Sequence, residues 1–264
     1  MAIITLTTDW GVKDYYVSAV KGAILSEYPE ANIVDVSHLV PPFDILQASF
    51  ILKNSFFNFP KGSVHLIGVN TLMEKDIRYL AVYSQGHYFI GADNGIFSLI
   101  FDSTPDKIIE LNLPSNVYNI TFPTKEILVK AACHMAKGGS IDLLGTEVNS
   151  YLERILLRAV VEGSVIRGSV IYIDSYKNVI TNITQTLFEE IGKDRPFTVF
   201  FRKFEYNIDV ISKSYTDVYE GEKVALFSST GYLEIAINQG KASGLLGLDM
   251  GDTVRVEFYD RKNS

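Results

Sequence analysis

Apolar residues in the first half of the chain alternate between short β-rich runs and stretches with helical spacing. The runs expected to form strands are Ile3–Thr8, Ile33–Val36, Val64–Val69, Tyr79–Tyr83 and Tyr88–Ile90. Helices are predicted over Asp14–Glu27, from Asp44 to about Phe57, and over Lys125–Lys137. This alternation predicts an α/β layer whose sheet is mainly parallel.

Local signals sharpen this prediction. Asp44, with Gln47 three residues later, is expected to cap the second helix at its N-terminus. The pair Gln85-Gly86 predicts a hairpin, and Gly138-Gly139 ends the third helix. Val64–Val69 is apolar throughout, which is typical of a strand covered on both faces of its sheet.

The second half of the chain changes character from about Val160 onward. β-branched and aromatic runs separated by short turns predict strands over Val165–Ile173, Phe197–Phe201, Val224–Phe227, Tyr232–Ile237 and Thr253–Phe258. We therefore expect a small all-β barrel domain at residues 164–264 after an α/β domain at residues 1–158.

Composition and net charge limit the kinds of protein and partner that this chain is compatible with. The chain has 264 residues, 47% of them apolar, so it can fill a core, and its formal net charge of −7 argues against nucleic acid as a partner. Its single cysteine, Cys133, excludes an intrachain disulfide. We expect no signal peptide and no membrane partner, because charges interrupt every apolar stretch before the ~18 residues of a span. A cytoplasmic location follows as the expectation.

The end of the first predicted strand carries a candidate site, Thr7–Asp14. Ligands of open α/β sheets bind beyond the carboxyl ends of the strands. Asp9 is positioned there to accept the two hydroxyls of a ribose, although it would also end a strand without any ligand. Asp14 is expected to cap the next helix, or else to join Asp9 in binding a divalent cation.

Two segments of the second half add polar candidates. Asp174, Tyr176 and Asn178 would share one face of a regular strand and suit a polar or planar ligand, but the same residues also favour a turn. The hydroxyls of Ser228–Gly240 are compatible with a ligand amine, carboxylate or purine edge, although a hairpin turn explains them equally well.

Metal and nucleophile motifs are lacking in the sequence. Its histidines, His38, His65, His87 and His134, have no helical i,i+4 pairing and no neighbouring cysteine ligands, so no metal is expected. Cys133 is interpreted as a small buried residue and not as a nucleophile.

Six segments together resemble the S-adenosylmethionine (SAM) hydroxide adenosyltransferase family, which also contains fluorinases and chlorinases. The segments, spread over nearly the whole chain, are Thr8–Asp14, Val34–Asp44, Phe59–His65, Gly91–Gly95, Asn178–Ile183 and Gly231–Ala236. The resemblance implies an α/β domain followed by a β-barrel, and a homotrimer whose sites lie between neighbouring subunits. It also implies attack on C5′ of SAM by water, hydroxide or halide with release of L-methionine, and no cofactor.

In the first half, the resemblance implies that Asp9 holds the ribose diol and that Phe43 packs near the sugar. Thr121, Phe122 and Thr124 match the loop that surrounds the nucleophile.

In the second half, the resemblance implies contacts with the methionine and adenine parts from Asp174, Tyr176 and Asn178, and an aromatic wall from Tyr215. Ser229 and Asn238 lie in the segment that contacts the amino-acid end.

The chain departs from the family at the positions that activate water. The water-using branch has an aspartate, an arginine and a histidine there, and this chain has Asn70, Ile77 and Pro123. Of the arginine pair only Arg78 remains. None of the three replacements supplies the same charge or hydrogen bond.

Three functions follow from these observations. The first is hydrolysis of SAM to adenosine and L-methionine, with water oriented by Thr124, Asn70 and backbone groups. The second is an adenosyl-binding protein with impaired catalysis. The third, least favoured, is a metal-dependent ribosyl hydrolase that uses Asp9 and Asp14.

Overall fold

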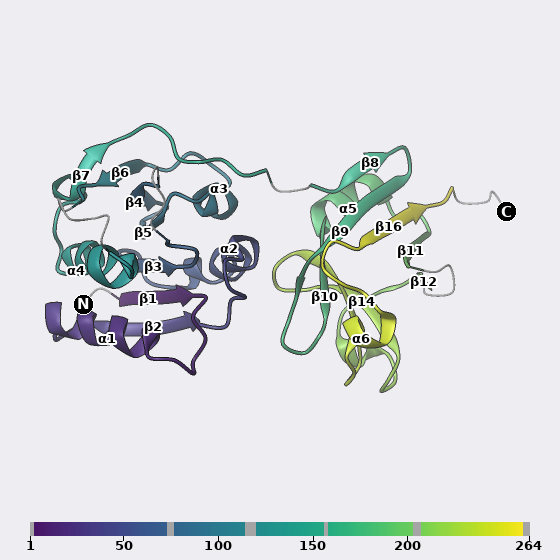
Figure 1. The fold of residues 1–264 in the computed structure, drawn as a ribbon. Helices are drawn as coiled ribbons and strands as arrows, with labels where there is room; N and C mark the ends of the chain where they lie inside the picture. Colours follow the sequence, from purple (N-terminus) through teal and green to yellow (C-terminus); the bar gives the residue numbers. More distant parts are fainter. Residues whose placement is uncertain (1–2, 73–76, 114–119, 156–157, 203–206, 261–264) are drawn as a thin grey trace. The chain divides into compact units, whose positions relative to one another are not determined.

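The computed structural model describes residues 3–72, 77–113, 120–155, 158–202 and 207–260. The chain divides into two compact units, Met1–Ile155 and Leu156–Ser264 (Figure 1). Each unit has its own core, as expected for a domain that buries one apolar interior.

The first unit is built on a mixed sheet. Within the described part of the unit, seven strands pair in the order β2-β1-β3-β5-β4-β6-β7. Their bounds are β1 Ile3–Thr8, β2 Asn32–Ser37, β3 Val64–Gly68, β4 Tyr79–Ser84, β5 His87–Ala92, β6 Lys107–Leu111 and β7 Gly145–Glu147. Strands β2, β1, β3 and β5 are parallel, and the β4, β6 and β7 pairings are antiparallel. The prediction of an α/β layer with parallel strands is confirmed.

Helices cover both faces of this sheet. Their bounds are α1 Tyr16–Glu27, α2 Ile45–Lys53, α3 Ile96–Ile100 and α4 Val129–Ala136. Apolar side chains of α1 and α4 pack with Ile4 and Leu6 in one cluster, and those of α2 and α3 pack with Ile67 on the other face. Strand β3 is therefore buried along its whole length, as its uninterrupted apolar sequence predicts. Among the helices of the described ranges, none is both long and apolar enough to cross a membrane.

Most local predictions in this unit are confirmed. The Asp44 carboxylate accepts a hydrogen bond from Gln47 N at 3.0 Å and caps α2. Gln85 and Gly86 have positive φ angles of 54° and 86° and join β4 to β5 as a hairpin. The prediction that Asp14 caps α1 is wrong. The helix begins at Tyr16, two residues after the predicted start, so Tyr15 occupies the N-cap position. No side chain caps this end of α1.

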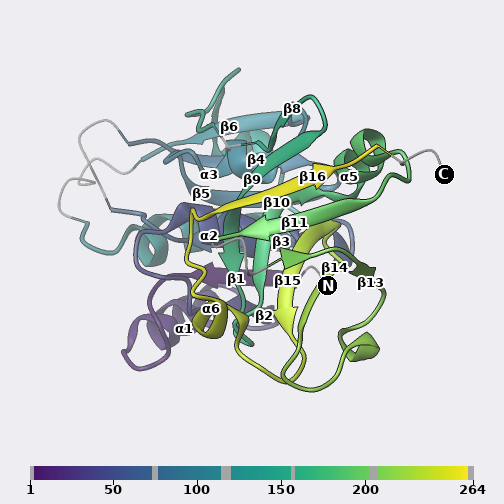
Figure 2. The ribbon, with the colours of Figure 1, turned by 90° about the vertical axis from the view of Figure 1, so that its right-hand side faces the viewer.

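The second unit is a strongly curved, barrel-like β-sheet, as predicted (Figure 2). The described strands are β8 Val160–Glu162, β9 Val165–Ile173, β10 Val179–Thr184, β11 Phe197–Phe201, β12 Asn207–Ile208, β13 Ile211–Ser212, β14 Lys223–Phe227, β15 Tyr232–Ile237 and β16 Thr253–Phe258. The main order is β12-β11-β16-β9-β10-β15-β14-β13, and β8 pairs with β9.

Two short helices, α5 Gln185–Gly192 and α6 Ala242–Leu246, accompany the barrel and were not predicted. Thr184 caps α5 by accepting a hydrogen bond from Leu187 N at 3.2 Å. Thr184 is also the last residue of β10, so the strand pattern of the sequence obscures the start of the helix.

Candidate functional site

The Asp9 carboxylate joins two loops at the carboxyl edge of the first sheet. Its Oδ2 atom accepts hydrogen bonds from the backbone amides of Phe43 at 2.9 Å and Asn70 at 3.2 Å. Within the described ranges its Oδ1 atom accepts none, and the side chain is half-buried. The Oδ2 atom thus orients the carboxylate, and the Oδ1 atom remains available to accept a hydrogen bond from a ligand hydroxyl.

Both loops that bind Asp9 have backbone conformations that side chains rarely adopt. Phe43 has a φ of 66° and Asn70 a φ of 46°, both in the left-handed region. This region is unfavourable for a bulky aromatic residue such as Phe43, which is 59% exposed. Strain of this kind concentrates at ligand-binding sites, where the surrounding structure must hold it.

The aromatic ring of Phe122 lies beside the Asp9 strand end. It meets the Trp10 ring edge-on, with centroids 5.1 Å apart, and the Tyr16 ring at 5.4 Å. Trp10 lies against Gly68, where an added Cβ would come within 2.6 Å of the indole. Thr121 is exposed next to Phe122. The structure therefore brings the predicted Phe122 loop together with the Asp9 turn.

The buried side chain and the backbone of His38 contact the turn that follows β1. Thr8 Oγ1 lies 2.7 Å from His38 Nδ1, and the His38 carbonyl accepts a hydrogen bond from Gly11 N at 2.7 Å. His38 Nε2 lies 3.1 Å from Asp35 Oδ1. Although partial burial raises the pKa of Asp35, Lys21 and His38 outweigh it and hold that pKa below its usual value. These contacts hold the residues at the end of β1 against His38.

Thr124 lies in the interior of the first unit. It begins a π-helical turn, Thr124–Leu128, that leads into α4. Its side chain is fully buried, and its hydroxyl lies 3.0 Å from the Thr71 hydroxyl. The Thr71 carbonyl in turn accepts a hydrogen bond from Tyr79 Oη at 2.9 Å. In this arrangement the Thr124 hydroxyl is already engaged within the protein.

The positions that activate water in the family hold no compensating group among the described residues. Ile77 packs against the core of the unit and Pro123 is buried. The Arg78 side chain instead binds Asp93, with its Nε and Nη2 atoms 3.0 and 2.5 Å from Asp93 Oδ2. Its Nη2 also donates to the Ser150 carbonyl at 3.1 Å. Arg78 therefore joins Asp93 to the backbone at Ser150, and its guanidinium does not replace the missing catalytic arginine.

In the second unit, Asp174 and Asn178 form a turn between β9 and β10. Asn178 donates from its amide N to Asp174 Oδ1 at 2.8 Å and from Nδ2 to Oδ2 at 3.1 Å. Lys177 has a φ of 70°, so the strand is interrupted here. The prediction that Asp174, Tyr176 and Asn178 share one face of a regular strand is therefore wrong. The alternative prediction of a turn is correct, because the antiparallel strands β9 and β10 need a tight connection.

The same turn borders an open pocket of about 620 Å³. Its lining includes Asp174, Tyr176, Asn178 and Tyr215 from the sequence prediction, together with Ser175, Ile237, Gln239, Gly240 and Lys241. Tyr176 is 80% exposed. The pocket brings together four predicted residues that lie up to 41 positions apart in the chain.

Ser229 and Asn238 are not among the residues that line this pocket. Ser229 is exposed in the turn between β14 and β15. Asn238 is buried, and its Nδ2 donates to the Val218 carbonyl at 2.9 Å. Their contact with a ligand remains a prediction, and the structure gives Asn238 a role in holding the segment that precedes β14.

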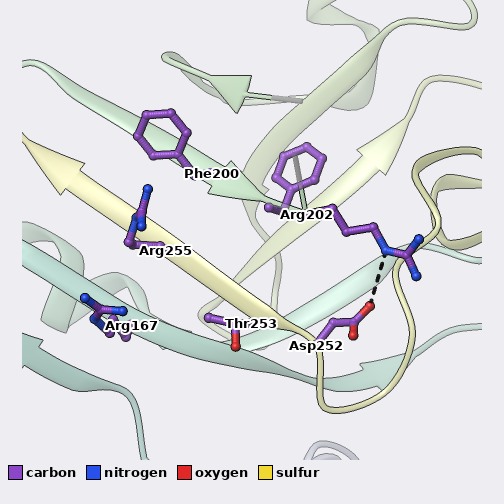
Figure 3. A pocket seen from close by; sticks show the side chains of 7 residues that line it. Arg167, Phe200, Arg202, Asp252, Thr253 and Arg255 are labelled. Atoms are coloured by element: carbon purple, nitrogen blue, oxygen red, sulfur yellow. Dashed lines mark ion pairs between the residues drawn. The ribbon is translucent and has the colours of Figure 1, made fainter. Parts of the chain in front are cut away.

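A second pocket of this unit, of about 300 Å³, contains three arginines (Figure 3). Each has an acidic neighbour: Arg202 lies 3.8 Å from Asp252, and Arg255 lies 2.9 Å from Glu257. Arg167 lies 3.2 Å from Glu162. These charges are balanced locally, and the pocket contains none of the predicted site residues.

Metal-binding and thiol chemistry find no further support here. In the part of the chain that the structure describes, no group of three or more His, Cys, Asp or Glu side chains is placed to hold a metal ion. Cys133 is fully buried in α4, and burial raises the pKa of its thiol to about 11. It packs as a small apolar residue, as predicted.

Comparison with known proteins covers both units. Residues 4–145 match the family profile "SAM hydroxide adenosyltransferase N-terminal domain", and residues 168–255 match "SAM hydroxide adenosyltransferase C-terminal domain". The chain is 29% identical to an "(R)-S-adenosyl-L-methionine hydrolase" of Thermus thermophilus over 97% of this chain and 100% of the relative. It is 25% identical to a "Fluorinase" of Nocardia brasiliensis over 97% of this chain and 96% of the relative.

Solved structures show the same fold. A crystal structure of an uncharacterized conserved protein from Thermotoga maritima has a TM-score of 0.87 and 29% identity, covering 96% of this chain and 99% of that one. A crystal structure of a conserved hypothetical protein from Thermus thermophilus has a TM-score of 0.76 and 29% identity, covering 97% of this chain and 100% of that one.

Proposed function

The chain belongs to the SAM hydroxide adenosyltransferase family, and on that premise we propose that it hydrolyses SAM to adenosine and L-methionine. The observation that carries this proposal is the full-length similarity to curated (R)-S-adenosyl-L-methionine hydrolases. The Asp9 carboxylate adds a physical argument, since it is oriented by two backbone amides and keeps one oxygen for a ribose diol.

The proposed reaction is an in-line displacement at C5′ of SAM. The oxygen of water forms a bond to C5′, the C5′–S bond breaks, and its electron pair returns to sulfur as the neutral thioether of methionine. The water proton is released to solvent. Because the sulfonium is already a good leaving group, orientation and desolvation of the nucleophile supply much of the acceleration.

The test is incubation of the purified protein with SAM in ¹⁸O-labelled water. We expect adenosine with one ¹⁸O at the 5′-hydroxyl and an equal amount of L-methionine, both measured by mass spectrometry. Turnover should persist in EDTA, as expected for a reaction that needs no metal. Absence of product above the uncatalysed rate would contradict the proposal.

A second candidate, a SAM-binding protein with little catalysis, has its own support. Asn70, Ile77 and Pro123 stand at the activating positions, and Arg78 is held by Asp93. This candidate predicts calorimetric binding of SAM or adenosine without product. If neither ligand binds at millimolar concentration, both candidates fail.

We also propose a cytoplasmic homotrimer with sites between neighbouring subunits, an assembly that the family resemblance supports. Light scattering coupled to gel filtration measures the mass of the assembly. A monomer at every concentration tested would contradict the proposal.

A further inference from the structure

Three adjacent parallel strands, β1, β3 and β5, are followed by polar residues that hydrogen bonds join in a row. Asp9 comes after β1, Asn70 after β3 and Asn94 after β5. Asn70 donates from its backbone amide to Asp9 Oδ2 at 3.2 Å. Asn94 donates from Nδ2 to the carbonyl of Asn70 at 3.0 Å and to that of Val69 at 3.1 Å. Asn94 therefore acts on Asp9 from two strands away.

The Asn94 side chain is buried, at 8% exposure, and makes three hydrogen bonds. Its Oδ1 atom accepts from the backbone amide of Ile96, the first residue of α3, at 3.1 Å. Aspartate or serine could make this contact equally well, because it needs only a side-chain oxygen. The bonds to the two carbonyls need the amide nitrogen, which supplies two donors. An asparagine is thus suited to both tasks at once.

The two carbonyls belong to the peptide groups on either side of the Asn70 Cα atom. The first of these groups, between Val69 and Asn70, binds Asn94 through its oxygen and Asp9 through its N–H. Asn70 has a φ of 46°, in the left-handed region that asparagine tolerates better than most residues. Because Asn94 binds both peptide groups, it stabilises this conformation and directs the N–H toward Asp9.

The loop that carries Asn94 is held independently of Asp9. The preceding residue, Asp93, accepts a hydrogen bond from Leu152 N at 2.7 Å through Oδ1 and binds Arg78 through Oδ2. Its backbone amide donates to the Arg78 carbonyl at 2.8 Å. These contacts anchor the start of the loop, so the Asn94 amide is presented to the carbonyls after β3 from a supported backbone.

We propose that Asn94 is a positioning residue for the contact between Asp9 and the ribose of the ligand. It acts through the peptide group between Val69 and Asn70, which orients the Asp9 carboxylate, and it does not itself touch the ligand. This inference rests on the proposed function, since it takes Asp9 as the residue that binds the ribose diol.

Calorimetric titration with adenosine and with 2′,3′-dideoxyadenosine tests this inference, because the second ligand lacks the diol. Wild-type protein should bind adenosine about tenfold or more tightly than the dideoxy compound. Asn94→Asp keeps the oxygen for Ile96 N but removes the donors to the carbonyls. It should reduce the ratio to about threefold or less and change the affinity for dideoxyadenosine by less than about twofold. A general structural defect would weaken binding of both nucleosides equally.

Two further proteins sharpen the test. In the double variant of Asp9→Ala and Asn94→Asp, the ratio should be no smaller than in Asp9→Ala alone, because the two residues act through one contact. Asn32→Asp is the matched control, since it adds the same charge at an exposed position of the same unit and should leave the ratio unchanged. Thermal unfolding verifies that each variant is folded. Should Asn94→Asp not fold, Asn94→Ser decides, because it also keeps an oxygen and removes the amide.

The outcomes separate this inference from the proposed function, which the ¹⁸O experiment tests on wild-type protein. If the Asn94 variants keep the wild-type ratio, or lose affinity for both nucleosides equally, Asn94 has no positioning role and the proposed function stands. If wild-type protein does not discriminate between the nucleosides, the inference falls while hydrolysis of SAM is still judged by its product. If wild-type protein binds neither nucleoside nor SAM, both proposals fall.

Discussion

Asp9 Oδ2 accepts a hydrogen bond from the backbone amide of Asn70 at 3.2 Å, across 61 positions of sequence. The contact joins the ends of β1 and β3, which are adjacent parallel strands. It places the residue expected to hold the ribose next to the position that holds an aspartate in the water-using branch of the family. The first site residue and the first family departure are therefore parts of one structural unit.

Asp9→Ala should weaken adenosine binding by about 1–3 kcal/mol, because a charge-assisted hydrogen bond to the ribose disappears. Isothermal calorimetry measures the change. Asp14→Ala is the control, since Asp14 is exposed and lies five residues away on the same segment. Unchanged adenosine affinity in Asp9→Ala would remove Asp9 from the site, and a loss in Asp14→Ala would revive the cation hypothesis.

Thr124→Val should lower the free energy of unfolding by about 1–2 kcal/mol, because the Thr71 hydroxyl would be left buried beside an apolar group. Thr124→Ser retains the hydroxyl and should lose less. Urea denaturation followed by fluorescence gives both values. If serine and valine cost the same, the hydroxyl pair contributes nothing measurable to stability.

Arg78→Met should destabilise the first unit by about 3–5 kcal/mol, because the buried Asp93 carboxylate would lose its cation. The double variant with Asp93→Asn should recover part of this loss, since no uncompensated charge remains. Thermal or chemical unfolding of the three proteins tests the pair. A double variant that is less stable than Arg78→Met would show that the arginine acts through other contacts.

Stability should fall as the pH decreases below about 6.5, partly because of a buried histidine pair. His65 Nε2 lies 3.2 Å from His87 Nδ1, and burial lowers the pKa of His65 to about 3, with the charge of His87 adding to the effect. Burial also lowers the pKa of His87, with Lys61 adding to that effect. The unfolded chain then binds more protons than the folded one between about pH 3 and 6.5.

From pH 7 to 5, His65 alone should cost about 2 kcal/mol of unfolding free energy. His65→Asn removes the titrating ring and should flatten the pH dependence of stability over this interval, even if it lowers stability throughout. Urea unfolding at several pH values measures this slope. An unchanged slope would show that His65 is not the titrating group.

The first unit was well predicted because its signals are local. The apolar run of β3, the Asp44 cap and the Gln85-Gly86 hairpin each depend on a few adjacent residues. The Asp14 cap failed because several nearby residues allow a helix start, and packing of α1 selects among them. Helix α5 was missed because its cap, Thr184, is also the last residue of a strand.

The candidate site was predicted in part. Asp174, Tyr176, Asn178 and Tyr215 do line one pocket, but the hydrogen bond from Tyr215 to Glu234 was overlooked because Glu234 lies in an apolar strand segment. The available signal was an acidic residue at a position that the strand buries. Thr71 had no signal of its own, since its importance depends on the neighbouring Thr124 hydroxyl.

The sequence by itself determined the two-part architecture, most strand positions and the family, because periodicity and motif order are properties of neighbouring residues. Only the tertiary structure decided which groups are already engaged: Thr124 with Thr71, Arg78 with Asp93 and Glu234 with Tyr215. These pairs join residues 15 to 53 positions apart. Burial and hydrogen bonding between such distant residues arise only when the chain is folded, and they leave no periodic trace in its order.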